Sequence, residues 1–182
     1  MPRRLLTALA LIALAGALIY YNHANQPAPP SSTTASKTTL PDWQGENATV
    51  WQVREGRSAA LHAQRVVHFP RKRTLLTVPT GRIDQPDNTY WFSARKGEQT
   101  GPVNQLSGQV RVLLERQTDP APLLLTTEQL RYLSDARRME SDTLVTIRQK
   151  DNWTRGTGMT LWLDAERLEL KKDVTSHYVP TP

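Results

Sequence analysis

The stretch 159–166, MTLWLDAE, decides the fold class of this 182-residue chain. Polar or bulky side chains alternate there with the apolar ones, which are Met159, Leu161, Leu163 and Ala165. This period of two is typical of a β-strand that packs one face on a core. Leu168 and Leu170 continue the pattern with an offset, which predicts a bulge within the same strand.

The same alternation recurs upstream, over 109–115 and 144–147. Turn-forming residues separate the apolar runs at short intervals; they are Gly56, Pro70, Pro79-Thr80-Gly81, Pro86-Asp87-Asn88, Gly101-Pro102, Asp119-Pro120, Asp151-Asn152 and Gly156-Thr157-Gly158. Many short strands with turns between them predict an all-β sandwich or barrel.

Four segments of the chain resemble one another: 60–66, 90–96, 124–130 and 162–168. Each combines an apolar strand with a small residue, which is Ala63, Ala94, Thr127 or Ala165, followed by polar residues. Taken alone, 126–138 would also fit a helix, because Thr126 and Gln129 have the spacing of a capping box. The repeat instead favours strand–turn–strand over 124–148, with the turn at 134–137.

The N-terminal segment has the pattern of a membrane anchor. Arg3 and Arg4 precede an uncharged apolar run over 5–21, which predicts a transmembrane helix with a cytoplasmic N-terminus. A cleaved signal peptide is the alternative, because small-x-small sites occur at 13–15 and 15–17. The following segment, 22–40, is rich in Pro, Ser, Thr and Ala and predicts a flexible linker. The expected division is therefore 1–21 cytoplasmic stub and transmembrane helix, 22–40 linker and 41–182 extracytoplasmic β-domain.

Composition and motifs disfavour catalysis. Cysteine is absent, which excludes disulfides and thiolate chemistry. The four histidines, His23, His62, His68 and His177, have no metal-ligand spacing. Asp164 and Glu166 share a strand face, but a solvated face beside Arg167 explains them better than acid–base catalysis. We therefore expect no enzyme activity, no cofactor and no metal; the net charge of +6 fits phosphate-bearing partners, and the expected compartment disfavours nucleic acid.

The aliphatic side chains indicate a binding surface. A repetitive sheet without helices must fold onto itself, and an incompletely closed sandwich leaves an apolar groove. The expected groove residues are Leu61, Leu76, Val78, Leu106, Val110, Leu125, Leu144, Leu161 and Leu163. The open edge strands of such a sheet would also accept a strand from a partner protein.

After the N-terminal anchor and linker come, in order, GRSAALHAQRV at 56–66, LSGQV at 106–110, DTLVT at 142–146 and the stretch 158–168. In these segments and their order, the chain resembles the LptC family of lipopolysaccharide export proteins. This resemblance implies an open, twisted antiparallel β-jellyroll that stands in the periplasm on one inner-membrane helix. The pattern departs from the family over 95–104, where Gly97, Gly101 and Pro102 interrupt the expected strands.

The resemblance also implies a function. Such proteins accept lipopolysaccharide from an inner-membrane ABC transporter and pass it to a periplasmic bridge protein of the same fold. The residues expected at the partner-binding edges are Thr49, Trp51 and Val53 toward the transporter, and Leu168, Leu170 and Tyr178 toward the bridge protein. By position, Leu76 would also contact the lipid. The alternative function is a membrane-anchored assembly scaffold that binds partners by strand addition and carries no lipid.

Overall fold

The computed structural model of this chain describes residues 40–54, 57–70, 73–133, 135–136, 138–162, 165 and 167–179. The expected transmembrane helix, and the expected linker up to residue 39, lie outside these residues. Within the described part, no helix is long and apolar enough to cross a membrane.

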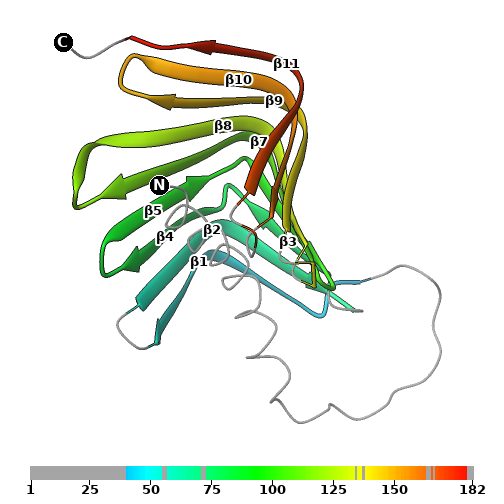
Figure 1. Cartoon of the computed structure of the whole chain (residues 1–182). Helices are drawn as coiled ribbons and strands as arrows, with labels where there is room; N and C mark the ends of the chain where they lie inside the picture. The colour runs from blue at the N-terminus through cyan, green and yellow to red at the C-terminus, as the bar shows by residue number, and fades with distance from the viewer. Residues whose placement is uncertain are drawn as a thin grey trace.

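The described residues form one antiparallel sheet, as expected for an all-β jellyroll (Figure 1). Its strands are β1 (Trp43–Arg54), β2 (Arg57–Phe69), β3 (Arg73–Thr77), β4 (Thr80–Gln85), β5 (Asn88–Ser93), β6 (Lys96–Thr100), β7 (Val103–Arg116), β8 (Asp119–Leu133), β9 (Arg138–Gln149), β10 (Asn152–Trp162) and β11 (Arg167–His177).

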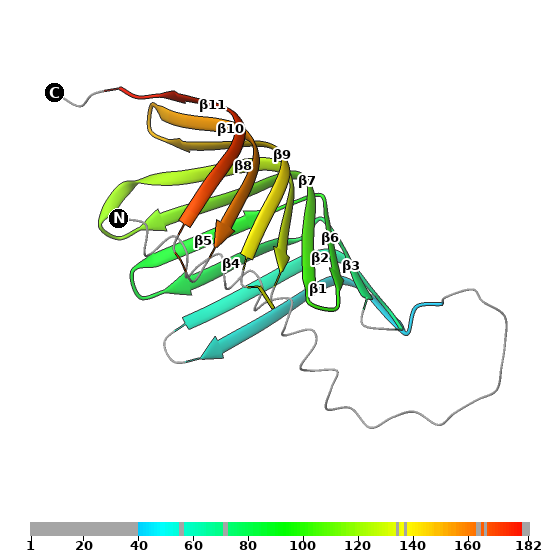
Figure 2. The same ribbon diagram turned by 45° about the vertical axis from the view of Figure 1, so that its right-hand side comes forward.

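The sheet bends into two facing layers. β3 and β4 pair with successive parts of β2, and β6 and β5 pair with successive parts of β7. We call the layer that contains β3 and β6 the first layer, and the layer that contains β4 and β5 the second layer. The longer strands run through both layers, so one continuous sheet supplies both walls of the interior (Figure 2).

Irregular residues mark the line where the sheet bends. Register shifts interrupt the pairings of β7 with β8, β8 with β9 and β9 with β10. Left-handed backbone conformations occur along the same line, at Asn47, Val78, Gly108, Gln109, Gly158 and Asp173. Bulges of this kind bend a strand and increase its twist, so a row of them folds the sheet onto itself.

The core lies between the two layers. Its fully buried side chains come from both of them and include Ile83, Tyr90, Val110, Met139, Val145, Met159 and Leu161. Tyr90 lies on β5, between β4 and β7 in the second layer, and burial raises the pKa of its hydroxyl to about 12. Such a core stabilises the fold because apolar surface leaves water.

The turns confirm some expectations and correct others. β8 and β9 form the expected strand–turn–strand in place of a helix. The single bulged strand expected over 159–170 is wrong, because β10 ends at Trp162 and Leu161 pairs with Leu168 of β11. An alternating pattern continues through a short turn unchanged, which explains the misassignment. At 95–104 the chain forms a hairpin of β6 and β7, with Gly101 in the left-handed conformation that such a turn requires.

Candidate functional site

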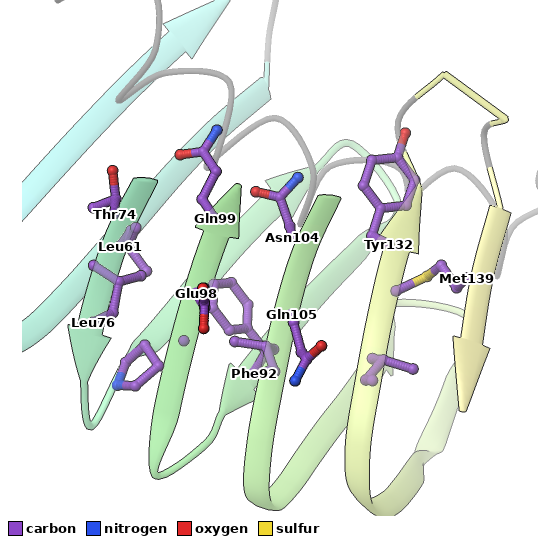
Figure 3. Close-up of a pocket in the computed structure, with 14 residues that line it drawn as sticks. Leu61, Thr74, Leu76, Phe92, Glu98, Gln99, Asn104, Gln105, Tyr132 and Met139 are labelled. Carbon is purple, nitrogen blue, oxygen red and sulfur yellow. The ribbon is translucent and has the colours of Figure 1, made fainter. Parts of the chain in front are cut away.

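A cavity opens between the layers under β3, β6, β7 and β8 (Figure 3). Its enclosed space is about 50 Å³, and the empty space amounts to about 550 Å³ when the open part at its mouth is included. The first layer contributes Thr74, Leu76, Gly97, Glu98, Gln99, Asn104, Gln105, Leu106, Leu130, Tyr132 and Met139, and the opposite side contributes Leu61, Pro79 and Phe92. Its walls are predominantly apolar, which is the usual character of a small-molecule site.

Two glycines shape this cavity. A Cβ at Gly81 would lie 2.0 Å from Cζ of Phe92, so the absence of a side chain lets the phenyl ring cross β4. A Cβ at Gly97 would lie 3.1 Å from Cδ1 of Leu76 and 3.4 Å from Cγ of Pro79. The glycine at 97, between its cross-strand neighbours Leu76 and Leu106, therefore lets the side chains of Leu76 and Pro79 approach its backbone closely.

The structure divides the expected groove residues into three groups. Leu61, Leu76 and Leu106 line the cavity, whereas Val110, Leu125 and Leu161 are buried in the core beside it. Val78 and Leu144 are exposed, at 37% and 56%, and do not line the cavity. Val78 lies on the bend line, with a φ of +47°. Leu163 lies outside the described residues.

Several cavity residues escaped the sequence analysis. Phe92 and Leu130 belong to two of the repeated segments, so the repeat contained a signal for them. Gln99, Asn104 and Tyr132 carried no such signal, because their common position depends on the pairing of separate strands.

Charge is nearly absent from the cavity. Its one carboxylate, Glu98, is paired with Arg73 at 2.9 Å, and both side chains are well exposed. A carboxylate with several hydrogen-bond partners, Asp84, lies elsewhere, on the outer side of the second layer. Partial burial disfavours the ionised form of Asp84, but hydrogen bonds from Arg82, Ser58 and Thr89 outweigh it and lower its pKa. The cavity thus provides shape and apolar contact, with no group poised for acid–base chemistry.

Both ends of the sheet present an unpaired edge strand. In the described chain, β1 pairs only with β2 and β11 only with β10. The expected edge residues lie on these strands: Trp51 and Val53 are 74% and 76% exposed, and Thr49 bonds His62 at 3.0 Å. On the opposite edge, Leu168 is 37% exposed, Leu170 is half-buried and Tyr178, just beyond β11, is 71% exposed.

Comparison with known proteins assigns the family. The sequence profile described as "LptC: Lipopolysaccharide-assembly, LptC-related" matches residues 8–179. The chain belongs to this LptC-related family. Among solved structures, it is similar to the crystal structure of LptH, the LptA homologous periplasmic component of the conserved lipopolysaccharide transport device from Pseudomonas aeruginosa. That match has a TM-score of 0.44 and 9% identity, and it covers 78% of this chain and 96% of that one. No curated protein matches the sequence.

A second hollow of this LptC-related protein lies on the outer face of the second layer. It is larger, with about 890 Å³ including open space, and it is lined by residues such as His62, Arg82, Trp91, Arg111 and Leu113. Two of its polar side chains are already engaged: Arg82 donates to Asp84 at 2.8 Å, and Nε1 of Trp91 donates to Glu115 at 3.1 Å. We favour the inner cavity as the functional site because it combines enclosure with apolar walls.

The histidines of the described chain do not converge. His62 is half-buried, whereas His68 is buried and bonds Thr74 at 2.9 Å, because β2 changes its inward phase between Ala63 and Val66. His177 stacks on Trp153 at the far edge. Across the residues described, no group of three His, Asp or Glu side chains could hold a metal ion.

Proposed function

We propose that this protein takes lipopolysaccharide from an inner-membrane ABC transporter into the cavity between its layers, and passes it to a periplasmic bridge protein of the same fold. Its family makes it a component of lipopolysaccharide assembly. The single observation that supports the finer statement is an apolar, nearly uncharged cavity in a sheet that is open at both ends.

The energetic reason is the cost of exposing acyl chains to water. Each CH₂ group that leaves water contributes about 0.8 kcal/mol, so one 14-carbon chain gains on the order of 10 kcal/mol in an apolar groove. Leu61, Leu76 and Leu106 provide such a surface without any reaction. The space enclosed by the cavity is only about 50 Å³, which is below the range of small-molecule sites, so a lipid with several chains requires the two layers to separate at their free ends.

The two edges give the transfer a direction. We assign β1 to the transporter and β11 to the bridge protein, as the family resemblance implies. Addition of a partner strand to an edge extends the sheet by backbone hydrogen bonds, and it would also extend the cavity from one protein into the next. The expected transmembrane helix would hold the N-terminal edge close to the transporter, with the β-domain in the periplasm.

Photocrosslinking in cells tests the proposal. A photoreactive residue replaces Leu76 or Leu106 in the cavity, or Leu144 as an apolar control on the outside, and adducts are detected with an antibody to lipopolysaccharide. We expect adducts from the two cavity positions and none from Leu144. Equal adducts from all three positions, or none from a folded and membrane-bound protein, would contradict lipid carriage.

A scaffold that carries no lipid is the second candidate. The observation that favours it is the exposure of Trp51 and Val53 on an unpaired edge. This function predicts normal copurification with partners and no lipid adduct at Leu76, so the same experiment separates the two.

A further inference from the structure

Two neighbouring rows of side chains line the inner side of the first layer, and they differ in polarity. The row nearer the bend line is apolar and consists of Val66, Leu76, Gly97, Leu106 and Leu130; we call it the apolar row. Two residues further along each strand, toward the mouth, the polar row consists of His68, Thr74, Gln99, Asn104 and Tyr132. Each row crosses the same five strands, and cross-strand pairing joins its members.

The polar row lines the cavity near the ends of strands β3, β6, β7 and β8. Thr74, Gln99, Asn104 and Tyr132 all contact the cavity, and Figure 3 shows them on the side away from Leu76 and Phe92. Gln99 and Asn104 are half-buried, whereas Thr74 and Tyr132 are 2% and 6% exposed. At about 4.8 Å between strands, the row extends for about 19 Å.

The polar row carries no carboxylate, ammonium or guanidinium group. The cations next to it in sequence are half-buried or exposed and are already paired: Arg73 with Glu98 at 2.9 Å, Arg131 with Asp142 at 2.5 Å and Arg138 with Glu140 at 2.8 Å. A phosphate would prefer such charged donors. The polar row is therefore suited to neutral groups that both donate and accept hydrogen bonds, as side-chain amides and hydroxyls do.

The distance between the rows indicates which part of a lipid would meet them. Two residues along a strand span about 7 Å, which is the length of only a few bonds of an acyl chain. A chain that packs on Leu76 and Leu106 would thus place its first few carbons at Gln99 and Asn104. In lipopolysaccharide these carbons bear an amide and a 3-hydroxyl group, whereas the chains of phospholipids are attached by esters and lack the hydroxyl.

We propose that Gln99, Asn104 and Tyr132 recognise the amide and 3-hydroxyl groups at the root of hydroxyacyl chains, and so distinguish them from unsubstituted acyl chains. This inference rests on the proposed lipid-carrying function and adds its specificity. Neutral hydrogen bonds each contribute little, so a ligand can pass from one strand to the next without being held at any single position.

The test compares two ligands that differ by one hydroxyl group. The full-length chain with a photoreactive residue at position 76 is titrated in detergent with tagged N-(3-hydroxytetradecanoyl)glucosamine or N-tetradecanoylglucosamine. We expect the hydroxylated ligand to reach half-maximal adduct at a concentration about three- to tenfold lower, as one or two neutral hydrogen bonds allow.

The variant Gln99→Met/Asn104→Leu keeps the volume of both side chains and removes their hydrogen-bonding groups. We expect it to bring the ratio of the two ligands to about one, with adducts of the unsubstituted ligand retained. Gln64→Met, an exposed amide near the bend line, is the matched control and should keep the wild-type ratio. If the double variant does not fold, Gln99→Met alone should at least halve the ratio.

The outcomes distinguish recognition by the polar row from the proposed lipid-carrying function. Adducts with a ratio unchanged in the folded variant would overturn the recognition by the polar row and leave lipid carriage intact. No adduct of either ligand with the wild-type chain would overturn both.

Discussion

Filling the cavity at Gly97 should stop lipid binding while the fold persists. Gly97 faces Leu76 and Leu106, and its backbone is not in the left-handed region, so Gly97→Leu adds four carbons where we expect the acyl chain to lie. Displacing an equal length of chain forgoes about 3 kcal/mol at about 0.8 kcal/mol per CH₂, which weakens binding on the order of a hundredfold.

The stability cost of this substitution should be moderate. The new Cβ would lie 3.1 Å from Cδ1 and 3.2 Å from Cβ of Leu76, so the Leu76 side chain has to shift. Overpacking of this kind costs about 1–3 kcal/mol, and loss of the glycine's freedom in the unfolded chain returns about 0.5–1 kcal/mol. At about 2–4 °C per kcal/mol for a domain of roughly 150 residues, we therefore expect the Tm to fall by at most about 10 °C.

Photocrosslinking from position 106, together with thermal unfolding followed by circular dichroism, measures both effects. Gly45→Leu is the matched control, because Gly45 pairs with Val66 of the apolar row and has no atom within 4 Å of an added Cβ. We expect adducts to be lost in Gly97→Leu and kept in Gly45→Leu. A folded Gly97→Leu protein with undiminished adducts would refute the assignment of the cavity as the lipid site.

Three further predictions concern stability and assembly. Met139→Ala removes most of a fully buried side chain that lines the cavity, and it should lower the free energy of unfolding by about 2–5 kcal/mol in urea titrations. A loss below about 1 kcal/mol would mean that the layers move together and fill the space. Because the pKa of Tyr90 is raised to about 12 in the fold, its unfolded-state hydroxyl ionises first, and stability should be lost as the pH rises from about 10 to 12. Tyr90→Phe should lack this component, so equal pH profiles of the two proteins would exclude it. Trp51→Lys changes a side chain that is 74% exposed on β1 and should leave the Tm unchanged but weaken copurification with the transporter; unaltered copurification would argue against β1 as the transporter edge.

The sequence determined the fold class because its signal is local. Alternating side chains such as those of 159–162 make one apolar face only in an extended strand, and turn residues show where the strands end. The repeat also decided correctly between helix and strand over 124–148. The family match over 8–179 agrees with the resemblance in the same segments.

Only the tertiary structure decided which side chains meet. Neighbouring side chains of a strand point to opposite faces, and Leu144 and Val145 are both apolar, so the pattern does not say which of the two points inward; in the structure Val145 is fully buried and Leu144 is 56% exposed. The antiparallel pairing of β10 with β11 escaped notice because the alternation of the sequence continues from one strand into the next. The polar row needs the register of five strands at once: Gln99, Asn104 and Tyr132 are distant or unremarkable in sequence and become neighbours through pairing alone. Strand identity is thus a property of short segments, whereas the inner surface of a folded sheet depends on long-range register.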